Sequence, residues 1–237
     1  MSPICCDGFQ VVFRRAMKFY VLESPDLGEE QEPRLAVTDF VPEDPVNRGD
    51  PQLCPVCQKP IGMLPWLPPY RVELEFWGRE PGDIAFFGGE LLISHRFQHL
   101  WKQARLVGLS GFERAEVVKT KSYGKKKGIK PLGDYYMVRI ARSRAAVDDE
   151  ASELVRPQGL ACQECRRGDP ERAKRIVIEE NTWSGEDIFY ARGLPGRIMT
   201  SERYRGFHIE NKINNGILIE ASEYDFDWRF GEGYKPR

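Results

Sequence analysis

The chain has 237 residues, enough to bury a substantial core as one domain or as two small ones. Its 35 basic and 36 acidic residues give a formal net charge of −1, so no overall field draws the protein to nucleic acid or to a membrane surface. No apolar segment has the length and flanking charges of a signal peptide or a transmembrane helix. We therefore expect a cytoplasmic protein whose cysteines stay reduced.

The N-terminal part of the chain has few regular patterns. Residues 1–16 show no clear period and are expected to form a disordered or non-native extension, with Met17 as a candidate for the true start. The alternation in residues 17–22 predicts a first strand. An acidic, proline-rich run follows, and residues 17–53 carry three basic against nine acidic residues, which predicts a solvated loop with a short strand over residues 35–40.

The next segment predicts a small α/β unit. Strict alternation of polar and apolar residues over 71–77 predicts a half-buried strand, and residues 83–87 predict a shorter one. Ser94 is a candidate N-cap for a helix whose apolar residues, from Phe97 to Ala104, lie three and four positions apart. A strand over residues 112–118 completes the unit. Beyond it we expect a basic hairpin around Lys125–Lys127 and a strand over residues 135–141.

The C-terminal part repeats the order of these landmarks. Ser201-Glu202-Arg203-Tyr204 matches Ser94-His95-Arg96-Phe97 at an offset of 107 residues, and Asp187-Ile188 follows a tryptophan as Asp83-Ile84 does. Gly216–Ile219 matches the strand after the first helix. We therefore predict an internal duplication in a mixed α/β (α+β) fold. The predicted parts are an extension (1–16), a first unit (17–118), a basic hairpin connector (119–150) and a second unit (151–237).

Each predicted unit carries one CxxC couple, Cys54/Cys57 in the first and Cys162/Cys165 in the second. Four thiolates are the number and type of ligands that a structural Zn²⁺ takes in a closed tetrahedral shell. The turn-forming residues after each couple predict knuckles, so we expect one zinc-ribbon-like site that joins the two units. Disulfides suit a reducing compartment poorly, and a thioredoxin-like couple requires a helix start that is missing here. Cys5 and Cys6, adjacent in the extension, are interpreted as incidental.

Taken together, these features resemble a known family. The two knuckles, the strand at Asp187–Phe189, the run Arg192–Gly196, the helix start at Ser201 and the acidic aromatic tail Glu223–Trp228 are similar to the myxobacterial double-CxxCG motif proteins. Members of that family include immunity proteins to swarming-inhibition toxins. The family name places a glycine after each second cysteine, whereas this chain has Gln58 and Arg166 at those positions and its glycines follow later.

The resemblance implies a cytoplasmic protein that binds the C-terminal domain of one cognate toxin and blocks it without chemistry of its own. If the toxin attacks nucleic acid, an acidic surface on the inhibitor would oppose the basic cleft of the toxin. The candidate carboxylates lie in the tail at Glu220, Glu223, Asp225 and Asp227, with further acidic runs at Glu29–Glu32 and Glu43–Asp44.

Two other classes of function are compatible with parts of the sequence. Clustered lysines between Lys119 and Lys130, near a zinc ribbon, could grip a phosphate backbone, which makes nucleic-acid binding the alternative hypothesis. An enzyme fits less well, because four cysteine ligands leave no open position on the metal. His95 and His99 are four residues apart on the predicted helix but lack a third ligand, and no nucleotide-binding glycine motif is present. We therefore expect no enzymatic activity.

Overall fold

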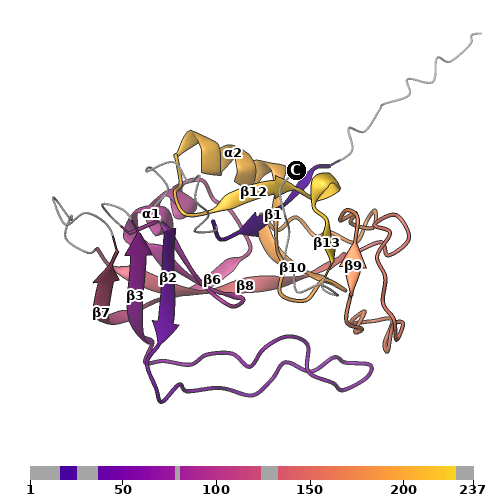
Figure 1. Cartoon of the computed structure of the whole chain (residues 1–237), viewed down its shortest axis with the longest axis horizontal. Coiled ribbons are helices and arrows are strands. Elements are labelled where there is room, and N and C mark those ends of the chain that lie inside the picture. Colours follow the sequence, from indigo (N-terminus) through magenta and orange to yellow (C-terminus); the bar gives the residue numbers. More distant parts are fainter. Residues whose placement is uncertain (1–16, 26–36, 78–80, 124–132, 228–237) are drawn as a thin grey trace, which may run out of the picture.

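The computed structural model describes residues 17–25, 37–77, 81–123 and 133–227. Within these residues, eleven strands form one sheet, two short strands form another, and two α-helices lie on one side of the large sheet (Figure 1). The predicted mixed α and β architecture is confirmed, and strands dominate it. The predictions for residues 1–16, for Glu29–Glu32 and for the lysine tip at Lys125–Lys127 fall outside the described residues.

The first half of the described chain ends at residue 123. Its elements are β1 (Phe19–Glu23), β2 (Val37–Pro42), β3 (Arg71–Trp77), β4 (Ile84–Phe87), β5 (Glu90–Ser94), α1 (His95–Gln103), β6 (Leu109–Arg114) and β7 (Glu116–Ser122). The predicted strand over residues 71–77 is confirmed with the same bounds. The single strand predicted over residues 112–118 is wrong. Its two parts have different neighbours, because β6 pairs with β8 (Tyr135–Ala146) while β7 runs parallel to β3.

The second half begins at residue 133. Its elements are β8, β9 (Arg172–Ala173), β10 (Ile188–Arg192), β11 (Ile198–Ser201), α2 (Glu202–Glu210), β12 (Ile217–Glu220), the short 3₁₀ helix η1 (Ala221–Glu223) and β13 (Phe226–Asp227). The predicted strand over 135–141 continues to Ala146 as β8. Both helices begin where the sequence predicts, because the Ser94 and Ser201 hydroxyls accept hydrogen bonds from the backbone N–H three residues later.

Strands of both halves form one sheet, and each half places one strand among the strands of the other. The order is β12-β1-β11-β10-β8-β5-β4-β2-β3-β7, with β6 also on β8. In this order β1, from the first half, lies between β11 and β12 of the second half. Conversely, the first part of β8 lies between β5 and β6 of the first half. The two arrangements match in register, since Phe19 pairs with Ser201 and Tyr135 pairs with Ser94.

A buried aspartate precedes each of two hairpins, β4–β5 and β10–β11, and organises the helix that follows. Asp83 accepts a hydrogen bond from the Ser94 hydroxyl at 2.7 Å, and Asp187 accepts one from the Ser201 hydroxyl at 2.8 Å. Both carboxylates also accept from an arginine of their own helix, Arg96 for Asp83 and Arg203 for Asp187. Each aspartate therefore fixes the N-terminal turn of one helix.

The same two arginines connect the helices to one another. Arg203 Nη2 donates to the carbonyl oxygens of Ala104 and Arg105, just after α1, at 2.6 and 2.9 Å. Arg96 donates in the same way to the carbonyl of Asn211, the C-cap of α2. The orphan carbonyls at the end of each helix are thus satisfied by the other helix.

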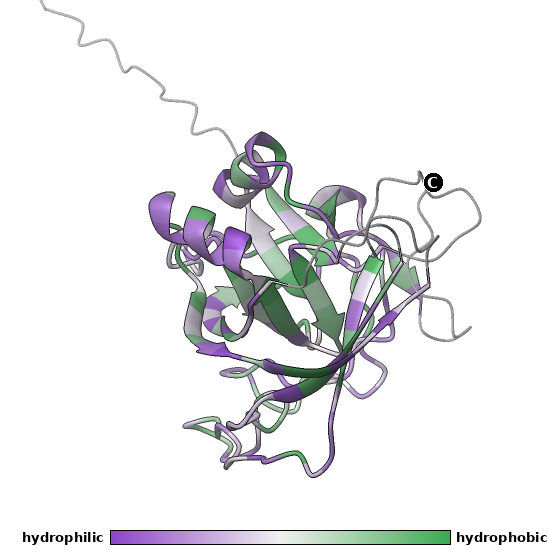
Figure 2. Ribbon diagram, turned by 90° about the vertical axis from the view of Figure 1, so that its left-hand side faces the viewer, coloured by the Kyte–Doolittle hydropathy of each residue, from purple (hydrophilic) through white to green (hydrophobic). Residues whose placement is uncertain are grey.

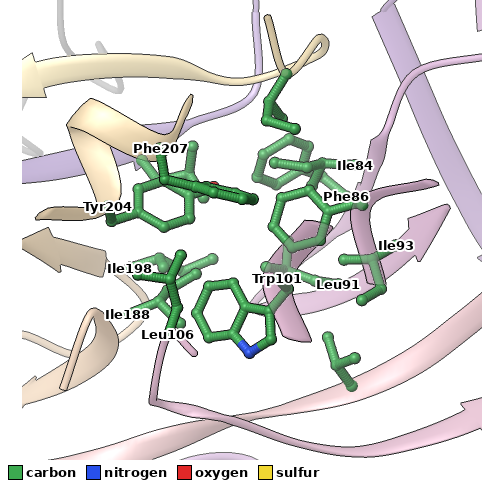
Figure 3. Packing of buried hydrophobic residues seen from close by; sticks show 14 residues of the cluster. Ile84, Phe86, Leu91, Ile93, Trp101, Leu106, Ile188, Ile198, Tyr204 and Phe207 are labelled. Atoms are coloured by element: carbon green, nitrogen blue, oxygen red, sulfur yellow. The ribbon is translucent and has the colours of Figure 1, made fainter. Parts of the chain in front are cut away.

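The central core lies where both helices meet both hairpins. Figure 3 shows Trp101 of α1 and Tyr204 and Phe207 of α2 packed among apolar side chains of the strands. The rings of Trp101 and Phe207 meet edge to face with centroids 6.2 Å apart. Two further clusters pack around Phe40 and Leu92 in the first half and around Phe189 and Met199 in the second. In Figure 2 the hydrophobic colour concentrates on the strands and the hydrophilic colour on the outward faces of the helices.

A glycine after α1 allows a close approach between the backbones of the two halves. Gly108 has a φ of +114°, and a Cβ there would lie 2.0 Å from the carbonyl oxygen of Ile188 in β10. We expect Gly108→Ala to lower the free energy of unfolding by about 2 kcal/mol more than Gly185→Ala. Gly185 is a matched control, because its φ is +105° but nothing lies within 4 Å of its Cβ position. Urea unfolding of both variants checks this, and equal losses would contradict it.

Candidate metal centre

The four cysteines of the two CxxC couples come together in the folded chain. Their Sγ atoms all lie within 4.8 Å of one another. Cys54 Sγ is 3.9 Å from Cys162 Sγ, and Cys57 Sγ is 3.8 Å from Cys165 Sγ. A tetrahedron of sulfurs around a metal at about 2.3 Å has edges of about 3.8 Å. The four thiols could therefore hold one metal ion, and they link segments 108 residues apart.

The first couple lies at the tip of a long irregular hairpin, residues 43–70, which we call the arm. Backbone hydrogen bonds join its two sides, from Gly49 N to Pro65 O and from Cys54 N to Lys59 O, both at 2.9 Å. At its base, Trp66 stacks on Phe40 of β2 with centroids 6.2 Å apart. In Figure 1 the arm leaves β2, runs beneath β8 and returns to β3. The tip thereby reaches the second half of the chain, where Cys162 and Cys165 lie.

The second couple is held by a buried arginine. Arg156, whose side chain is 3% exposed, is paired with Asp149 at 2.8 Å. It also donates to the carbonyls of Gly168, after the second couple, and Gly193, after β10. A buried guanidinium with several acceptors is well placed to fix loop backbone. The second knuckle is therefore tied to the end of β10.

Both knuckles share a left-handed residue after the second cysteine. Gln58 has a φ of +55° and Arg166 a φ of +51°, values that normally favour glycine. Each is helped by its own side chain, since Gln58 donates to the carbonyl of Pro55 and Arg166 pairs with Glu179. The chain therefore adopts at these two positions the backbone that a CxxCG sequence would reach with glycine.

The surroundings shift the pKa values of the Cys54 and Cys165 thiols in opposite directions. Backbone N–H groups, first that of Cys57 and then that of Val56, lower the pKa of Cys54 to about 7. Burial raises the pKa of Cys165. Thiols must be deprotonated to bind a metal, and N–H groups aimed at sulfur stabilise the thiolate. Cys54 is buried, so this stabilisation occurs away from bulk water.

The acidic tail is partly engaged within the chain. Glu220 forms an ion pair with Lys18 at 2.9 Å, and hydrogen bonding from Lys18 lowers the pKa of Glu220. Asp225 and Asp227 are half-buried, whereas Glu223 is exposed. Of the four carboxylates predicted to contact a partner, Glu223 is the one that faces solvent most openly.

The lysines of the alternative hypothesis also have partners. Lys119 pairs with Glu73 at 3.1 Å, and Lys121 pairs with Glu75 at 2.6 Å, both across the β3–β7 edge. Hydrogen bonding from these lysines lowers the pKa of Glu73. The remaining lysines of the tip lie outside the described residues. His95 and His99 are exposed on α1, and the ring of His95 contacts Tyr136.

A cavity of about 920 Å³, which we call the arm cavity, lies beside the four cysteines. It is lined by the arm, by β8, by the second knuckle and by the turn between β10 and β11. The turn at Gly89–Glu90 also lines it. Sequence reasoning missed the cavity, because its walls come from five separate segments of the chain.

Comparison with known protein families and with curated proteins identifies no relative of this chain. No protein-family model matches the chain, and the search of curated proteins found no match. Within the part of the chain that the structure describes, no helix has the length and apolar character needed to cross a membrane.

Proposed function

We propose that the four cysteines hold one structural Zn²⁺ that fastens the arm of the first half to the knuckle of the second. Sulfur separations close to a tetrahedral edge and an all-thiol donor set support zinc. Four ligands fill a tetrahedral shell and leave no position for water or substrate, so the ion would be chemically silent and would act as a cross-link.

We further propose that the chain is an internal duplication with exchanged strands. The support lies in matched positions: the two capping serines, the two aspartates, the two arginines that reach the opposite helix, and the two left-handed residues after the knuckles. Strand β1 of the first half adds to the β10–β11 hairpin of the second half, and β8, which lies in the predicted connector, adds to the β4–β5 hairpin of the first half. Such an exchange would account for the shared central core.

On this scaffold we propose the function of an immunity protein that binds the C-terminal domain of a cognate toxin and neutralises it. The observation that carries this is the closed thiol cluster, which supports a rigid binding scaffold over catalysis. The left-handed backbone at Gln58 and Arg166 adds weight, because it reproduces the turn of a CxxCG motif. The exposed Glu223 is the first candidate contact with a basic toxin surface.

The test is growth of a host that expresses the proposed toxin domain, namely the C-terminal domain of the protein encoded by the neighbouring gene. We expect toxicity without this protein, and rescue together with co-purification when it is present. Glu223→Lys should weaken the complex about tenfold, since one well-placed charge contact contributes on the order of 1.4 kcal/mol. Glu180→Lys, at an exposed carboxylate outside the tail, is the matched control.

Toxicity without rescue would contradict neutralisation and favour the alternative, a nucleic-acid-binding protein. One observation supports that alternative. Trp77 and Tyr123 stack with centroids 4.8 Å apart at the same edge as Lys121, and Tyr123 is 54% exposed.

A further inference from the structure

The arm cavity has the size and shape of a binding site. Its volume of about 920 Å³ lies near the upper end of the range for sites that enclose a ligand, about 300–1,000 Å³. The arm and β8 both line it, so a ligand would contact the irregular arm as well as the centre of the sheet.

The segments that line the cavity differ in chemistry. The arm contributes apolar side chains, namely Pro51, Pro55, Pro60, Ile61, Met63 and Leu64. The other lining segments contribute six arginines, namely Arg139, Arg142, Arg144, Arg166, Arg167 and Arg192. Four carboxylates also line the cavity, those of Asp50, Glu90, Glu164 and Asp169, so basic groups are in excess by two. Several of these already have acidic partners: Arg192 pairs with Glu164 and Arg166 with Glu179. A ligand for this space must therefore combine apolar groups with negative charge.

Arg142 is one of three arginines of the cavity that form no ion pair within the described residues; the other two are Arg144 and Arg167. No residue of the described ranges forms an ion pair or a side-chain hydrogen bond with it, and crowding by protein lowers its pKa. Its guanidinium lies against the backbone of Gly62 in the arm, where a Cβ would be 2.0 Å from Nη1. A planar guanidinium without a carboxylate partner can donate two parallel hydrogen bonds to a carboxylate of a ligand.

Arg144 and Arg167 extend the basic wall. Their side chains are exposed, and neither forms an ion pair within the described part of the chain. Met63 and Leu64, in the arm, are 54% and 45% exposed. Large apolar side chains that remain open beside unpaired arginines are typical of a surface that a partner covers.

We propose that the arm cavity binds a segment of a partner polypeptide that carries carboxylate and aliphatic side chains, with a carboxylate on Arg142. A nucleic-acid backbone would use the arginines but would leave the proline, methionine and leucine wall without a partner. A single small anion would fill only part of the space. This proposal goes beyond toxin neutralisation and does not rest on it, because the site can be tested on the protein alone.

The experiment measures fluorescence anisotropy of two labelled hexapeptides with the metal-loaded full chain, one of alternating glutamate and leucine and one of alternating lysine and leucine. We expect the glutamate peptide to bind, more weakly as salt is raised, and the lysine peptide not to bind. Arg142→Gln should weaken binding of the glutamate peptide about tenfold or more, because hydrogen bonds to charged groups are strong. Arg144→Gln should weaken it less.

Arg114→Gln is the matched control, because Arg114 is exposed, pairs with Asp134 and does not line the cavity. A circular dichroism melt checks that each variant is folded. If Arg142→Gln does not fold, Arg144→Gln still tests the cavity. Equal binding of the two peptides, no binding of either, or unchanged affinity in both cavity variants would overturn the proposal. Displacement of the peptide by 10 mM inorganic phosphate at constant ionic strength would also overturn it, in favour of a site for small anions.

Discussion

Replacing Cys162 with serine is expected to abolish binding of the proposed metal and to lower the melting temperature by about 10–20 °C. The four thiols connect points 108 residues apart. A cross-link that closes a loop of about 100 residues lowers the conformational entropy of the unfolded chain, which stabilises the folded state by about 4.7 kcal/mol. For a chain of this length, each kcal/mol corresponds to about 2–4 °C. Differential scanning calorimetry with metal analysis of the same samples measures both effects.

The double variant Cys5→Ser/Cys6→Ser is the control for the loss of thiols as such. It should keep its metal and melt like the wild type, since these two cysteines are not part of the predicted site. Chelation of the wild type should reproduce the lower melt of Cys162→Ser. A Cys162→Ser protein that melts at the wild-type temperature would show that the cross-link contributes nothing to stability.

Asp187→Ala is expected to lower the free energy of unfolding by about 4 kcal/mol. The carboxylate is 3% exposed and accepts hydrogen bonds from Ser201, from Arg203 and from the backbone N–H of Val107. Its removal leaves these donors without their acceptor, frees the N-terminal turn of α2 and releases Arg203 from the end of α1. The expected fall in melting temperature is about 8–16 °C.

Ser201→Ala separates the capping effect from the rest of this network. Losing one N-cap hydroxyl should cost about 1 kcal/mol, well below the loss for Asp187→Ala. Asp83→Ala should match Asp187→Ala, because Asp83 occupies the same place relative to Ser94 and Arg96. If Asp187→Ala melted no lower than Ser201→Ala, the connection between the two helices through Arg203 would be energetically unimportant.

Local signals in the sequence predicted those parts of the fold that depend on short segments. Ser94 and Ser201 cap helices because a hydroxyl three residues before a backbone N–H satisfies it wherever the helix lies. The strand over 71–77 is recognisable because one of its faces is buried and the other is not. The clustering of the four cysteines was predictable from ligand type, since two CxxC turns in one chain are typical of a shared metal site.

The exchange of strands and the arm could not be predicted in the same way. Pairing of β1 with β11 joins Phe19 to Ser201, and no local pattern in either strand specifies its partner. The arm cavity depends on five segments that are far apart in the sequence and meet only in the folded chain. The break between β6 and β7 was missed because both strands are half-exposed or exposed, so no periodic apolar pattern in the sequence marks where one strand ends and the next begins.

The most direct test of the account is X-ray absorption at the zinc edge, together with metal analysis, on the purified full chain. The account predicts one zinc per chain, coordinated by four sulfurs at about 2.3 Å, and loss of that signal in Cys162→Ser. A protein that binds no metal, or a zinc with fewer than four sulfur ligands, would contradict the closed cross-link on which the proposed scaffold depends.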